Sequence, residues 1–201
     1  VVIAGHTVKG ILGYAGQVAV LRRFLGLSDE RGGLDQTEPL YELALSDLAT
    51  PDCTGLTLRP LADAPRDLVT GWRRAYLEEV LPMPGEDTGQ KAKDDIENYI
   101  AADSHRVLYQ GDAPLAKTGF NAVLPEAVQI GGAYTPPAAR SRGLARLAVA
   151  MHLQEARARG VERAILFAAS AQACKAYEAI GFARTGEFTI LFYEEPQVIY
   201  G

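Results

Sequence analysis

The segment that most constrains this chain joins the end of an expected strand to the start of an expected helix. It reads Thr135-Pro-Pro-Ala-Ala-Arg-Ser-Arg-Gly-Leu-Ala145. Pro136 and Pro137 end the strand, because proline cannot donate to a sheet ladder. The free N–H groups of the first helical turn, with the positive end of the helix dipole, form a site for an anion. Arg140 and Arg142 add charge suited to phosphate, so the segment predicts a seat for a pyrophosphate.

A second motif follows about thirty residues later and reads Ser170-Ala-Gln-Ala-Cys-Lys-Ala-Tyr-Glu-Ala-Ile-Gly-Phe182. Taken in this order and spacing, the two motifs resemble the GNAT superfamily of acetyl-CoA-dependent N-acetyltransferases. The resemblance covers roughly residues 55–195. One position departs from the pattern, because Ser170 stands where such proteins often carry asparagine.

The resemblance implies an α/β (α+β) fold with a mixed, mostly antiparallel sheet and helices on both of its faces. The central strands, Val128–Thr135 and Ala164–Ala168, would splay and admit the pantetheine arm of acetyl-CoA between them. The Gly131-Gly132 pair fits a close approach of ligand to backbone, and a simple strand bulge explains it equally well.

The resemblance also implies which residues hold acetyl-CoA as co-substrate. Backbone groups of residues 133–135 would bind the pantetheine arm and polarise the acetyl carbonyl, and residues 140–145 would hold the pyrophosphate. The expected cofactor residues are Ala133, Tyr134, Thr135, Arg140, Ser141, Arg142, Gly143, Leu144, Ala145 and Ser170.

Tyr177 matches the family's usual general acid near the thioester sulfur. A phenol with a pKa near about 10 can give a proton to a departing thiolate with a pKa near about 8.5. The general base is not identified by the sequence, and Tyr134 and Glu97 are the preferred candidates because we expect them near the cleft. The other residues considered for this role are Glu78, Glu79, Glu126 and His105.

The first fifty residues predict a small β-α-β-like leader, and residues 55–201 predict the acetyltransferase domain. We expect strands at 1–4 and 40–45, a helix with its apolar side beginning at Ile11, and a loop over residues 28–38. In the main domain we expect a strand at 56–61, a helix capped by Asp63, and a helix over 90–101. Further strands and helices are expected at 106–110, 115–123, 127–135, 144–159, 164–168, 172–180 and 188–193. Because the chain begins at Val1 in a strand-like segment, we expect a longer protein.

Composition and charge limit the classes of partner that we expect for this chain. The net charge of −5 argues against a nucleic-acid-binding surface and suits a cationic amine. Cys53 and Cys174 lack metal-ligand spacing, so we expect no metal and read them as reduced thiols in the cytoplasm. No apolar run reaches membrane-spanning length, so no membrane partner is expected. The chain could form a homodimer.

Two function classes compete on these residues. The first is an enzyme that moves acetyl from acetyl-CoA to a primary amine of a small molecule or a protein by direct attack in a ternary complex. The second is a regulatory module that binds acyl-CoA without turnover. Ser170 at the usual asparagine position and the lack of an identified base are both compatible with such a module. A third reading is an interaction scaffold that has lost the cofactor.

Overall fold

The computed structural model describes residues 5–27, 33–80, 87–168 and 170–199. It contains two compact units, one formed by residues 41–183 and the other by residues 1–40 together with 184–201. The sequence prediction instead divided the chain at residues 50–55, and it assigned the last strand to the acetyltransferase domain. The division into a leader and an acetyltransferase domain stays a prediction.

The chain forms a mixed, mostly antiparallel sheet, and the fold class predicted from the sequence is confirmed. Its strands run in the hydrogen-bonded order β1-β8-β2-β7-β6-β5-β4-β3. The strands are β1 (Thr7–Tyr14), β2 (Leu34–Ala44), β3 (Leu56–Pro60), β4 (His105–Gln110), β5 (Ala113–Val123), β6 (Ala127–Tyr134), β7 (Arg163–Phe167) and β8 (Ala183–Val198). The helices are α1 (Ala15–Phe24), α2 (Arg66–Val80), α3 (Thr88–Ala101), α4 (Leu144–Ala158) and α5 (Ala171–Glu178). No helix in these described ranges is long and apolar enough to cross a membrane.

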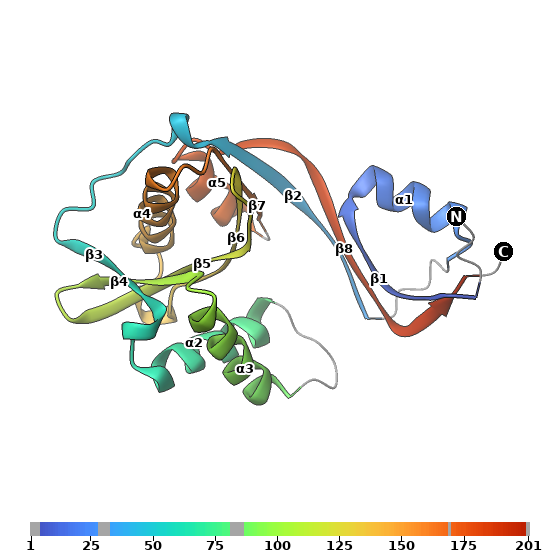
Figure 1. The fold of residues 1–201 in the computed structure, drawn as a ribbon, viewed down its shortest axis with the longest axis horizontal. Helices are drawn as coiled ribbons and strands as arrows, with labels where there is room; N and C mark the ends of the chain where they lie inside the picture. Colours follow the sequence, from blue (N-terminus) through green and yellow to red (C-terminus); the bar gives the residue numbers. More distant parts are fainter. Residues whose placement is uncertain (1–4, 28–32, 81–86, 169, 200–201) are drawn as a thin grey trace. The chain divides into compact units, whose positions relative to one another are not determined.

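In the unit of residues 41–183, helices cover both faces of the strands. Helices α2 and α3 lie on one side of β4 and β5, and α4 lies on the other (Figure 1). Helix α4 contributes Val149 and Leu153 to a core that also contains Phe120 and Leu166. Each such side chain, when fully buried, stabilises the fold by about 1.5–3 kcal/mol.

A second core forms on the face covered by α2 and α3. Trp72 and Ile96 pack there against Val107. Between the two helices, Arg73 and Asp95 form a largely buried ion pair, with 2.6 Å between Nη2 and Oδ2. Burial removes both charges from water, so each charged side chain is stable in this position only because it pairs with the other. The pair therefore fixes α2 against α3.

Local signals explain where the helices of this unit begin and end. The carboxylate of Asp87 accepts hydrogen bonds from the N–H groups of Gly89 and Gln90, which caps α3. Gly160 follows the end of α4 with a φ of +95°, the left-handed conformation that commonly stops a helix. The expected cap at Asp63 is wrong, because that residue lies in a 3-10 turn and α2 begins only at Arg66.

The first forty residues differ most from the sequence prediction. Residues 7–14 are strand rather than helix, because β1 pairs antiparallel with β8, with Ile11 opposite Leu191. These ladder bonds override the helical spacing of the apolar residues, and α1 starts only at Ala15. Strand β2 begins at Leu34, inside the expected loop. The strand predicted at residues 1–4 lies outside the described residues.

Candidate functional site

The site begins where β6 and β7 part. These parallel strands pair only from Ala127–Gln129 to Arg163–Ile165. Beyond that point the strands leave a cavity of about 250 Å³, lined by Gly132, Ala133 and Tyr177 among others. The splay between central strands that the resemblance implied is therefore present in the geometry of the chain.

A bulge in β6 lies beside this gap. Against β5, Lys117 faces Tyr134 and Gly119 faces Gly131, so β6 holds one residue more than its partner. Gly132 has a φ of +62° at this point, which glycine adopts without steric cost. The Gly131-Gly132 pair thus forms the bulge that the sequence left as one of two explanations.

The loop after β6 turns directly into α4. Pro137 opens a short 3-10 turn that ends at Ala139. Ser141 and Gly143 then have φ values of +63° and +73°, and Gly143 is the N-cap of α4. The first N–H groups of a helix have no partner within the helix. Successive N–H groups around left-handed residues can face an anion, and the anion site that the sequence predicted for this segment stays a prediction.

A second cavity, of about 390 Å³, opens at this helix start. Its wall contains nine of the ten residues expected to bind the cofactor, together with Tyr177. Those nine are Ala133, Tyr134, Thr135, Arg140, Ser141, Gly143, Leu144, Ala145 and Ser170. Arg142 is exposed and does not line this cavity. Glu97 does not line it either: it lies on α3, largely exposed, and forms an ion pair with Arg66 at 3.2 Å.

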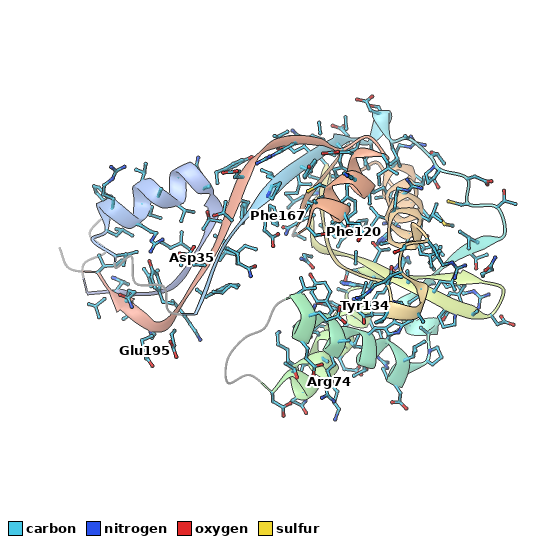
Figure 2. The ribbon with its side chains drawn as sticks, turned by 180° about the vertical axis from the view of Figure 1, so that it is seen from behind. Asp35, Arg74, Phe120, Tyr134, Phe167 and Glu195 are labelled. Atoms are coloured by element: carbon cyan, nitrogen blue, oxygen red, sulfur yellow. The ribbon has the colours of Figure 1, made fainter. Side chains whose placement is uncertain are left out.

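Three side chains of the wall contact one another. Arg140 donates a hydrogen bond from Nη2 to Oε2 of Glu79 at 2.5 Å, and from Nε to the carbonyl oxygen of Thr135 at 3.0 Å. The hydroxyl of Tyr134 donates to Oε1 of Glu79 at 3.4 Å. Tyr134 lies on the side of the sheet that faces α2 and α3 (Figure 2). Burial, and then the charge of Glu79, raises the pKa of Tyr134, so its phenol stays protonated at neutral pH.

Tyr177 lines both cavities from α5. Its ring packs edge-on against Phe182, with 6.0 Å between centroids. Burial, and then the nearby Tyr76, raises the pKa of Tyr177 to about 12. The phenol is therefore a hydrogen-bond donor at neutral pH, which is the protonation state that a general acid requires.

Two hydroxyl groups of the wall, those of Ser170 and Thr135, differ in their hydrogen bonds. The hydroxyl of Ser170 accepts a hydrogen bond from the N–H of Ala173 at 3.2 Å and so caps α5. The buried hydroxyl of Thr135 has no hydrogen-bond partner among the described residues. A buried polar atom without a partner is costly, and a bound ligand would relieve that cost.

The sequence did not single out Tyr76 or Arg146 of the wall, and it gave Glu79 only as one of several possible bases. Tyr76 and Glu79 come from α2, where their one-turn spacing matches an ordinary helix face. Arg146 lies in the first turn of α4, and its buried Nε has no partner among the described residues. Its place as a basic residue in the first turn of the helix after Gly143 was the available signal for it.

The family model of the acetyltransferase (GNAT) family matches residues 69–182, which is more than half of the chain. The chain belongs to the GNAT acetyltransferase family. The match contains most of α2, the bulged and parting strands, the turn into α4, and α5. Acetyl transfer is the activity for which the matching family is named.

Solved structures share the fold of this GNAT chain. A GCN5-related N-acetyltransferase from Kribbella flavida is 19% identical with a TM-score of 0.57, and the match covers 90% of this chain and 65% of that one. A GNAT-family acetyltransferase from Colwellia psychrerythraea is 14% identical with a TM-score of 0.61, over 93% of this chain and 66% of that one. A predicted acetyltransferase with acetyl-CoA from Clostridium acetobutylicum is 20% identical with a TM-score of 0.50, over 65% of this chain and 90% of that one.

The chain spans just under two thirds of the Kribbella and Colwellia proteins. At these identities the likeness concerns the fold. A search of curated proteins found no match.

Proposed function

We propose that this chain is an N-acetyltransferase that moves the acetyl group of acetyl-CoA to a primary amine by direct attack in a ternary complex. One observation carries the proposal. The gap between β6 and β7 continues into a cavity at the N-terminus of α4, and nine of the ten expected cofactor residues line that cavity. The acceptor is an amine-bearing small molecule or a protein amine.

In this proposal the cofactor binds largely through main chain. The pyrophosphate lies at the first turn of α4, where Ser141 and Gly143 have left-handed backbone conformations and the first N–H groups of the helix have no partner within it. Arg140 and Arg146 supply positive charge at the same cavity. The pantetheine arm follows residues 133–135, whose backbone no longer pairs with β7.

The chemistry requires three groups. The neutral amine attacks the thioester carbonyl, a C–N bond forms, the C–S bond breaks, and the thiolate leaves with the proton that Tyr177 supplies. Backbone N–H groups of residues 133–135 stabilise the oxyanion, an interaction worth about 10²–10³ in rate for each donor. The proton of the amine passes to Glu79, directly or through water. Glu79 is the one carboxylate among the candidate bases that lines the described cavity at α4.

Thermal unfolding with saturating acetyl-CoA tests the cofactor site. Ligand at about one hundred times its dissociation constant adds roughly 2.7 kcal/mol, which in a chain of this size raises Tm by about 5–10 °C. ATP serves as the control, because it carries phosphates without the pantetheine arm. Equal Tm values with and without acetyl-CoA would contradict the proposal.

A screen of amines by thiol release then separates the enzyme from the binding module. Release that depends on both an amine and acetyl-CoA supports the enzyme. A Tm rise without release for any small-molecule, peptide or protein amine would instead favour a module that binds acyl-CoA without turnover.

A further inference from the structure

Lys117 on β5 has a fully buried side chain, with 0% of it exposed. Lysine is almost never fully buried without a charged partner. Its Nζ donates a hydrogen bond to the carbonyl oxygen of Gly132 at 2.8 Å. The structure thus directs a buried amine at the main chain of the β6 bulge.

The charged and titratable groups around Lys117 come from three elements. Arg73 of α2, Asp95 and Tyr99 of α3, and His105 of β4 surround it, and Nζ lies 5.6 Å from the centroid of the Tyr99 ring. Asp95 is bonded to Arg73 at 2.6 Å and to Lys91 at 3.1 Å, so its charge is already shared between two cations. An ion pair therefore does not explain the position of Lys117.

These surroundings determine the charge on the amine. Burial, and then the neighbouring Arg73, lowers the pKa of Lys117 to about 7, against the opposing effect of Asp95. Burial, and then Lys117 itself, lowers the pKa of His105, so that ring stays neutral. The amine consequently changes its charge near neutral pH while its neighbours keep theirs.

The accepting carbonyl belongs to the peptide unit that continues into Ala133. In a planar trans peptide the C=O of Gly132 and the N–H of Ala133 share one conjugated group and point in opposite directions. A hydrogen bond to the carbonyl polarises the unit and strengthens its N–H as a donor. Ala133 lines both cavities of the site.

We infer that Lys117 is a positioning residue for acetyl transfer, which holds the Gly132 carbonyl in the bulge and strengthens the Ala133 N–H as a donor to the thioester carbonyl. This inference rests on the proposed function. It assigns Lys117 no contact with substrate, because the side chain acts through the peptide unit.

The infrared carbonyl stretch of bound acetyl-CoA, labelled with ¹³C at the carbonyl carbon, reads out this polarisation directly. In the wild type the stretch should lie at a lower frequency than in free acetyl-CoA. Lys117→Met, which keeps an unbranched side chain one atom shorter and removes the donor, should bind acetyl-CoA within about threefold of wild type. Its stretch should return toward the free value, and its kcat should fall at least about tenfold, as when an oxyanion donor is weakened.

Lys93→Met is the matched control, because Lys93 lies exposed on α3 and should leave both the stretch and kcat unchanged. A Lys117→Met protein with the wild-type stretch and kcat overturns the inference, even if it unfolds at a lower temperature. A wild-type protein that does not bind acetyl-CoA would instead contradict the proposed function.

The wild type offers a second test that needs no variant. Protonated Lys117 is the stronger donor, so the carbonyl stretch of bound acetyl-CoA should rise in frequency as the pH increases from 6 to 8. If Lys117→Met does not fold, this series decides alone when it is extended from pH 5 to 10, and a stretch that stays constant over the whole of that range overturns the inference.

Discussion

Arg140 and Glu79 form an ion pair in the wall of the larger cavity, with 2.5 Å between Nη2 and Oε2. The two residues come from different elements, since Glu79 lies on α2 and Arg140 lies in the loop before α4. The guanidinium that is expected to meet a pyrophosphate is therefore bound to a carboxylate of the same chain. An incoming phosphate must compete with Glu79 for it.

This competition predicts two opposite effects of Glu79→Gln. The variant should bind acetyl-CoA about two- to fivefold more tightly, because an exposed ion pair contributes little and its loss frees Arg140. Its kcat should fall at least about tenfold, because the proposed proton acceptor is gone. Calorimetric titration and thiol release measure the two. Glu78→Gln is the control, since Glu78 pairs with Arg74 on the exposed side of α2. Weaker binding by Glu79→Gln would contradict the competition.

Tyr177→Phe should leave acetyl-CoA binding within about threefold of wild type and lower kcat by about 10²–10⁴. The reason is that the hydroxyl is needed only when the thiolate leaves. Steady-state kinetics beside calorimetry separate the two effects. Tyr193→Phe removes a buried hydroxyl that has no hydrogen-bond partner among the described residues, and it should change neither. Unchanged turnover in Tyr177→Phe would remove this residue from the mechanism.

Arg146 should matter more for the cofactor than Arg142. Arg146 lines the cavity and its Nε is buried without a partner in the described part of the chain, whereas Arg142 is exposed. A hydrogen bond to a charged group contributes about 1.5–3 kcal/mol, so Arg146→Ala should weaken acetyl-CoA binding by about ten- to a hundredfold. Arg142→Ala should stay within about threefold. The reverse order in calorimetric titrations would show that the phosphates lie elsewhere.

His152 should make the fold sensitive to acid. It stacks on Phe120 with 3.8 Å between centroids. Burial, and then the positive charges of Arg106 and Arg159, lowers the pKa of His152 to about 3. Below about pH 6.5 His152 binds a proton in the unfolded chain but stays neutral in the folded chain, so the free energy of unfolding falls as the pH drops toward 3. The loss is about 1.4 kcal/mol per pH unit for this residue.

Urea unfolding at pH 7 and pH 4.5 measures this effect. His152→Leu should lose about 2–3 kcal/mol less than wild type between the two values, because it has no proton to bind. Equal losses in the two proteins would show that His152 accepts a proton while folded.

The elements that the sequence predicted well carry their own local signals. Pro136 and Pro137 stop a strand, and Gly143 and Gly160 mark the two ends of α4. Each of these residues restricts the backbone by itself, so one sequence is enough to place the turn and the helix.

The elements that the sequence missed depend on partners far along the chain. Strand β1 exists because it pairs with β8, which begins more than 160 residues later. Arg146 lines the cavity from the first turn of α4, whereas Arg142 lies in the loop before the helix and is exposed. Glu97 was expected near the cleft, but α3 directs it toward Arg66.

The parting of β6 from β7 has a consequence for how this chain can change. Peptide groups belong to every residue, so replacing the side chains of Ala133 or Thr135 leaves the N–H and C=O groups of that stretch in place. Those groups are set by the ladder and by the bulge at Gly132. Helix α2 contributes to the cavity through side chains instead. Substitutions on α2 can therefore alter which molecules enter the cavity. The main-chain N–H groups at the open end of β6 stay the same in any related chain that keeps the sheet.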